Sequence, residues 1–209
     1  MRHKRSRALG TATGLVAWSF ASPRLPYHLQ PFANAALGTA LAVWTRAPLG
    51  LTPPAVYRGL RAGSVAATAV AAVVAAGTAL PAVRAAMNDR QPPGDPPARW
   101  LLLRIPLGTV WAEETSYRGA LASSGAAAFG PAAGRLLQTA AFGLSHIADA
   151  RAARESVVRT VAVTAAAGWV FGALAERTGS LAAPMLAHLA INEAGAVATL
   201  LVQRRRLRH

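Results

Sequence analysis

Residues Trp100 to Gly119 read WLLLRIPLGTVWAEETSYRG. Most of this run is apolar enough to lie in a membrane, yet it carries two adjacent acids, Glu113 and Glu114. The whole chain has only 8 acidic residues among 209. An ionised acid at the centre of a membrane helix costs roughly 2.5–3.5 kcal/mol on insertion scales. Because acids so placed are usually functional, the pair marks a candidate functional site.

The composition is that of a polytopic membrane protein. Hydrophobic residues make up 53% of the chain and charged residues 14%, whereas a soluble domain carries about 25% charged residues. No strand-like alternation persists, so we predict an all-α fold. The expected architecture is a polytopic transmembrane helical bundle of about six to seven membrane helices with a core of four motif-bearing helices. The apolar segments that support it lie at about 8–21, 29–45, 62–83, 100–123, 131–147, 157–175 and 180–202.

The net charge of +14 is concentrated in the tails and between the apolar segments. This distribution is typical of loops that face anionic lipid, and it argues against nucleic acid as a partner. Both tails are basic, so the sequence predicts a multi-pass protein of the plasma membrane with both termini cytoplasmic. That arrangement requires an even number of spans, and six spans beginning at 29–45 satisfy it. The first apolar segment is expected to be a retained anchor or span, not a cleaved signal peptide.

A polar linker divides the chain. Residues 88–97 contain four prolines, a glycine and several charges, a composition typical of a loop. The sequence is therefore divided into membrane helices and linker at 1–99, a motif-rich membrane core at 100–202, and a basic tail at 203–209. The chain has no cysteine, which excludes disulfides, thiolate metal sites and a cysteine nucleophile.

Helical spacing distinguishes the two acids. Glu114 lies four residues before Arg118, on the same face of a helix, so the two can form an ion pair that makes burial less costly. Glu113 is rotated by about 100° from Glu114 and is the less committed carboxylate. We expect Glu113 to act as a general base, with Glu114 and Arg118 supporting the site. The alternative, that both acids pair with arginines only to hold helices together, stays open.

Two of the five histidines lie within apolar segments. His146 ends one such run, and Phe142, one helical turn earlier, would pack against its ring or line a cavity. His188 lies inside the last run, and Asn192 follows one turn later. The Asn192 amide suits the orientation of a water molecule or an oxyanion. An interhelical hydrogen bond is the alternative for this residue.

Two histidines and a glutamate can serve hydrolysis in two ways. Glu113, His146 and His188 are the residue types of a catalytic zinc site, so a divalent metal held by these three is one alternative. In the other, Glu113 activates water while the histidines and Asn192 stabilise the oxyanion. No His-Glu-x-x-His run is present, which excludes the zinc proteases built on that motif. A small proton-coupled transporter that uses Glu113 and the histidines as a relay is a further alternative.

Taken together and in order, the motifs resemble the CPBP family, the membrane-embedded CAAX-protease and bacteriocin-processing group also labelled Abi. The family signature is Glu-Glu-x-x-x-Arg, then Phe-x-x-x-His, then His-x-x-x-Asn or Asp. It is matched here at 113–118, 142–146 and 188–192. Each motif alone is weak, but all three on successive apolar segments make a strong match. The resemblance covers about residues 100–202.

The resemblance implies an intramembrane endopeptidase acting on a membrane peptide or protein. Carried over by position, Glu113 with His146 activates water, while His188 and Asn192 bind the oxyanion or water. The second acid of the pair and the arginine of the same motif have supporting roles. The family has been described both as metalloendopeptidases and as glutamate proteases, so the resemblance leaves the metal undecided. A non-catalytic membrane adaptor or immunity protein on the same fold is the alternative function.

Overall fold

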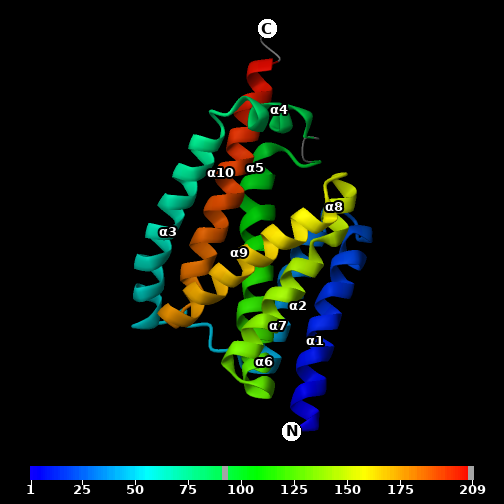
Figure 1. The fold of residues 1–209 in the computed structure, drawn as a ribbon, viewed down its shortest axis with the longest axis vertical. Helices are drawn as coiled ribbons and strands as arrows, with labels where there is room; N and C mark the ends of the chain where they lie inside the picture. Colours follow the sequence, from blue (N-terminus) through cyan, green and yellow to red (C-terminus); the bar gives the residue numbers. More distant parts are fainter. Residues whose placement is uncertain (91–93, 207–209) are drawn as a thin grey trace.

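The computed structural model describes residues 1–90 and 94–206, and this part of the chain is helical without strands. The all-α prediction is therefore confirmed for the described residues. Residues 91–93 of the linker and residues 207–209 of the basic tail lie outside them. Each predicted apolar segment corresponds to one long helical segment of the bundle (Figure 1). These segments are α1 (Arg2–Ala21), α2 (Gln30–Thr45), α3 (Ala55–Gly77), a composite helix at 97–129, α7 (Pro131–Ser145), α9 (Val157–Thr178) and α10 (Ala182–Arg206).

Shorter elements join the long helices. They are η1 (Ser22–Arg24) after α1, α4 (Pro81–Asp89) after α3, and α8 (Ile147–Ala152) after α7. The apolar pattern did not predict these three, because they are too short to show periodicity. In Figure 1, α9 crosses the bundle obliquely, and it packs against both α7 and α10.

The composite helix has an unusual backbone. It consists of α5 (Pro97–Arg99), η2 (Trp100–Trp111), η3 (Glu114–Leu121) and α6 (Ala122–Phe129), and η2 and η3 are wide π-helical turns. Pro106 lies inside η2 and has no backbone N–H, so the regular α-helical hydrogen-bond pattern cannot continue through it. π-helical turns are rare and frequently occur at functional sites. The two acids lie where η2 meets η3.

Close helix packing positions this junction. α2 packs against η2 and η3. A Cβ atom at Gly38 on α2 would lie 2.6 Å from the backbone oxygen of Ala112, so only glycine allows this approach. Gly168 likewise allows α9 to approach α7 closely, because a Cβ at this position would lie 2.9 Å from Phe142 Cδ1. The backbones of α2 and α9 thus lie directly against the residues that form the site.

Two apolar clusters flank the junction. One joins α1, η3 and α7, and the other joins η2 to α10. The buried members of the first are Ala12, Leu15, Tyr117, Leu121, Ala141 and Phe142, and those of the second are Ile105, Val110 and Ala196. Polar side chains that serve the site are therefore held between two well-packed layers.

Membrane crossing is indicated for part of the bundle. Among the described residues, α3, α9 and residues 182–204 of α10 are long and apolar enough to cross a membrane. Many of their large side chains are exposed, including Val65, Val73, Val158 and Val163, as expected for a surface in contact with lipid. These observations support a membrane protein but do not establish six to seven spans.

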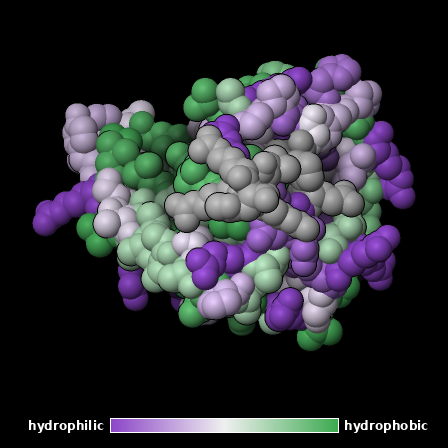
Figure 2. Space-filling model, turned by 90° about the horizontal axis from the view of Figure 1, so that it is seen from above, coloured by the Kyte–Doolittle hydropathy of each residue, from purple (hydrophilic) through white to green (hydrophobic). Residues whose placement is uncertain are grey.

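The two termini lie at opposite ends of the long axis (Figure 1). A chain whose seven long segments all crossed the membrane would place its two basic tails on opposite sides. Six spans would place both tails on one side, and their shared cytoplasmic location stays a prediction from the charge pattern. Seen from the C-terminal end, hydrophilic residues gather mainly on the side where α8 and the end of α1 lie (Figure 2).

Candidate active site

The sequence motifs meet inside the bundle through His188. Its Nδ1 atom lies 2.7 Å from Oε1 of Glu114, and its Nε2 atom lies 3.7 Å from Oε2 of Glu113. Because an ionised carboxylate only accepts hydrogen bonds, Nδ1 of His188 donates to Glu114. One imidazole ring on α10 therefore bridges the two adjacent acids of the composite helix.

Glu114 and Arg118 form the ion pair that their spacing predicted. Nη1 of Arg118 lies 3.2 Å from Oε1 of Glu114, and both side chains are 0% exposed. The guanidinium carbon lies 3.9 Å from the ring centroid of Phe142 and 5.1 Å from that of Phe171. Aromatic faces attract such a cation. Removing one partner from a buried ion pair typically costs about 3–5 kcal/mol, so this pair is a structural element of the site.

Glu113 differs from its neighbour in exposure. Its side chain is 27% exposed, against 0% for Glu114. Within residues 1–90 and 94–206, no group makes a hydrogen bond to its Oε2 atom. The adjacent acids are thus one buried ion-pair partner, which helical spacing predicted, and one partly exposed carboxylate.

His146 lies at the break between α7 and α8, with φ −89° and ψ 4°. Its Nδ1 atom lies 2.8 Å from the backbone oxygen of Phe142. A backbone carbonyl only accepts, so the ring proton is assigned to Nδ1, and Nε2 of the neutral ring keeps its lone pair. The Phe142 ring packs edge-on against His146 at 4.8 Å between centroids. Phe142 therefore fixes the histidine through both its backbone and its ring.

Phe171 on α9 is a site residue that the motifs did not indicate. Its ring stacks on His188 with centroids 5.0 Å apart and planes 27° from parallel. It also lies below the Arg118 guanidinium. The residue belongs to a helix without a motif, and only the tertiary packing of α9 brings it here.

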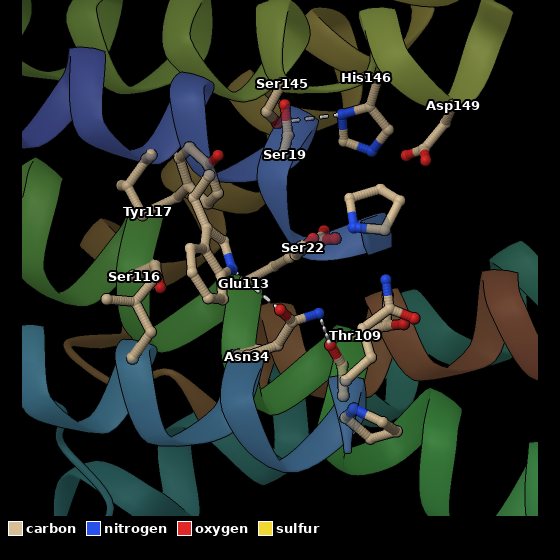
Figure 3. A pocket seen from close by; sticks show the side chains of 18 of the residues that line it. Ser19, Ser22, Asn34, Thr109, Glu113, Ser116, Tyr117, Ser145, His146 and Asp149 are labelled. Carbon is tan, nitrogen blue, oxygen red and sulfur yellow. Dashed lines mark hydrogen bonds between the residues drawn. The ribbon is translucent and has the colours of Figure 1, made fainter. Parts of the chain in front are cut away.

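Glu113 and His146 line one cavity of about 210 Å³ (Figure 3). Tyr117, Ser145 and Asp149 also line it. Other lining residues come from the first hundred residues, which the family resemblance did not cover. They are Leu15, Trp18, Ser19, Ser22, Pro23, Gln30, Pro31, Asn34 and Leu37.

Hydrogen bonds join some of these lining residues. Trp18 Nε1 donates to Asn34 Oδ1 at 2.9 Å, a link drawn in Figure 3. Arg104 from η2 also lines the cavity, but its donors are engaged. Its Nε donates to Asp95 Oδ2 at 2.7 Å and its Nη1 to Gln30 Oε1 at 2.7 Å. The remaining nitrogen donates to the Tyr27 backbone oxygen at 2.6 Å.

The Asn192 side chain is bonded within its own helix. Its Nδ2 donates to the backbone oxygen of His188 at 3.0 Å, within its own helix. In the described part of the chain, neither Asn192 nor His188 is among the residues that line the 210 Å³ cavity. The structure therefore brings Glu113 and His146 to the cavity and places His188 behind Glu113, where it contacts both acids.

Asp149 reaches the cavity from α8, beyond the end of α7. It belongs to none of the three sequence motifs. Desolvation by the surrounding protein raises the pKa of its carboxyl group, and the neighbouring His146 acts in the opposite direction. Asp149 is an exposed residue at the cavity.

The metal alternative requires three ligands that converge on one point. Among residues 1–90 and 94–206, no group of three or more His, Cys, Asp or Glu side chains is arranged to hold a metal ion. Glu113 and His188 approach each other, but His188 directs its other nitrogen to Glu114. The three suggested ligands therefore do not present a zinc site of the catalytic type.

A comparison with protein families places these motifs in context. The model of the type II CAAX prenyl endopeptidases, Rce1-like, matches residues 95–194, which include both acids and both site histidines. Comparison with curated proteins and with solved structures gave no match. The matched residues span η2, η3, α7 and the first half of α10, so the family's region coincides with the site described above. Over residues 95–194, the chain is therefore similar to the Rce1-like type II CAAX prenyl endopeptidases, a family of membrane proteases.

Proposed function

We propose that the chain is an intramembrane endopeptidase that hydrolyses a peptide bond with a water molecule activated by Glu113. The observation that carries the proposal is the shared cavity of Glu113 and His146, which come from separate helices. One offers a carboxylate without a hydrogen bond to its Oε2 from any described residue, and the other a free Nε2 lone pair. A carboxylate and an imidazole at one polar cavity are suited to general acid–base catalysis. The family match supports the protease class.

The reaction follows from these two groups. Glu113 takes a proton from the water as the water oxygen bonds to the scissile carbonyl carbon, and the carbonyl electron pair moves to its oxygen. His146 Nε2 accepts the second hydrogen of the water and so orients it. When the carbon–nitrogen bond breaks, the electron pair re-forms the carbonyl, and Glu113 returns its proton to the leaving nitrogen. The products are a carboxylic acid and an amine.

The other motif residues have supporting roles in this proposal. His188 keeps the Glu113 carboxylate in place through Nε2, and Glu114 with Arg118 keeps His188 in place. Such an arrangement holds the base by buried contacts that do not themselves react. The oxyanion role that the resemblance gives to Asn192 requires its amide to leave the His188 backbone oxygen when substrate binds.

The proposed setting is the plasma membrane. A membrane peptide or protein is the substrate, and anionic lipid is expected at the basic tails, where arginine and lysine interact with negative headgroups. No metal is assigned to the reaction.

The test is cleavage of a library of transmembrane peptides by purified protein in lipid nanodiscs. Wild type is compared with Glu113→Ala and His146→Ala, and Glu193→Gln serves as a control acid on α10. Loss of cleavage in the first two variants, with activity retained in the control, is the expected result. Undiminished cleavage by Glu113→Ala would contradict the proposed function.

A further inference from the structure

Asp149 is an acid of the cavity that the proposed reaction does not use. It lines the same 210 Å³ cavity as Glu113 and His146, and Figure 3 shows its carboxylate beside the imidazole. It comes from α8, which lies outside the three helices long and apolar enough to cross a membrane. The residue is exposed. The carboxylate is thus accessible to a group that enters the cavity.

No cation of the described chain neutralises this acid. The ion pairs at 4.0 Å or less within residues 1–90 and 94–206 do not include Asp149. Arg104, the arginine on the cavity wall, is paired with Asp95, whose side chain is 3% exposed. In the described part of a chain with 22 lysines and arginines and only 8 acids, two acids, Glu113 and Asp149, thus line one cavity, and no lysine or arginine forms an ion pair with the second.

The two carboxylates of the cavity favour binding of a positively charged group. Two carboxylates in a partly enclosed cavity create a negative potential that attracts a cation more strongly than it would in open water. A fixed charge at the cavity wall is also a common basis of side-chain selectivity, because it favours one charge and rejects the other. The titratable groups of the cavity that act on Asp149 are His146 and Glu113, and neither supplies a permanent positive charge.

We infer that Asp149 is a specificity-determining residue that binds a lysine or arginine side chain of the substrate next to the scissile bond. This inference rests on the proposed function and names the substrate class of the same site. It predicts that the enzyme prefers a membrane peptide with a basic residue within two positions of the cleaved bond. Glu113 remains the base, and the cation is held by Asp149 nearer the α8 end of the cavity.

The experiment uses full-length protein in nanodiscs and paired transmembrane peptides that differ only in lysine or norleucine beside the cleaved bond. Wild type is expected to cleave the lysine peptide with the higher kcat/KM. Asp149→Asn should raise KM for the lysine peptide roughly three- to tenfold, with kcat and the norleucine peptide little changed. Asp149→Lys should reverse the preference, and Asp149→Glu should retain it. Glu155→Gln removes a nearby exposed acid that does not line this cavity and should behave as wild type.

Two outcomes overturn the inference: equal cleavage of both peptides by wild type, or an equal effect of Asp149→Asn on both. A binding measurement separates this result from the proposed reaction. N-acetyl-lysine amide, but not N-acetyl-norleucine amide, should show saturation-transfer NMR contact with wild type and lose it in Asp149→Asn. Equal binding of N-acetyl-lysine amide to wild type and to Asp149→Asn would also overturn the inference. Undiminished cleavage by Glu113→Ala would refute the proposed reaction. The NMR binding result would still decide whether Asp149 binds a lysine side chain.

Discussion

Nδ1 of His188 lies 2.7 Å from Oε1 of Glu114, and both side chains are buried. This hydrogen bond joins residues that are 74 positions apart in the sequence and ties α10 to the acid-bearing helix. The opposite side of the same ring contacts Glu113 at 3.7 Å. The position of the proposed base therefore depends on the buried Glu114, through one histidine ring.

The buried ion pair gives a prediction about stability. Arg118→Ala should lower the free energy of unfolding by about 3–5 kcal/mol, because Glu114 would be left buried without its cation. Arg135→Ala is the matched control, since its pair with Glu176 is 3.0 Å long but 25% and 51% exposed. That control should lose only about 1 kcal/mol or less. Thermal unfolding in detergent measures both, and equal losses would contradict a special role for the buried pair.

The different contacts of His188 and Asn192 give a prediction about activity. His188→Ala should reduce kcat at least a hundredfold, roughly the size expected when the positioning of a catalytic group is lost. Asn192→Ala should cost about tenfold or less, because its amide bonds only the backbone of its own helix. Steady-state kinetics on one cleaved peptide compares the two variants. A loss in Asn192→Ala as large as that in His188→Ala would restore the oxyanion role that the resemblance implies.

The close approach of α9 gives a third prediction. Gly168→Ala would place a methyl group 2.9 Å from Phe142 Cδ1 and 3.5 Å from Arg118 Nη2. Overpacking of this kind typically costs about 1–3 kcal/mol, and here it should also displace Phe142 and so reduce activity. Gly195→Ala is the control, because a Cβ at Gly195 meets no atom within 4 Å. A Gly168→Ala protein with the stability and activity of wild type would refute this packing argument.

Metal dependence can be tested directly. The ligand geometry leads us to expect full cleavage by protein that has been treated with a chelator and shown by elemental analysis to contain no zinc. Loss of activity on chelation, with recovery when zinc is added, would establish the metal alternative instead. Circular dichroism of the same samples must show that the protein remains folded after treatment with the chelator.

Local patterns predicted a large part of this molecule. Apolar periodicity located every long helical segment, since a helix in a membrane must present apolar residues over most of its length. The Glu114–Arg118 ion pair was predictable for a similar reason, because its partners are four residues apart on one helix. The family motifs then predicted that Glu113, His146 and His188 belong to one site.

Contacts between distant segments could not be predicted in this way. The bond between His188 and Glu114 and the stacking of Phe171 on His188 depend on how α9 and α10 pack, which no local pattern encodes. Trp18 and Asn34 reach the cavity from helices that the family motifs do not cover. Asp149 follows an apolar run and belongs to no motif, and it reaches the cavity from α8.

The central claim is that Glu113 is the base of a peptide-bond hydrolysis. Glu113→Gln replaces the carboxylate by an amide of nearly the same shape, so the contact with His188 can be kept while the ability to take a proton is lost. Mass spectrometry of a transmembrane-peptide library after incubation with each protein measures cleavage. The account predicts specific cleavage by wild type and none above background by a folded Glu113→Gln protein. Equal cleavage by the two proteins would contradict it.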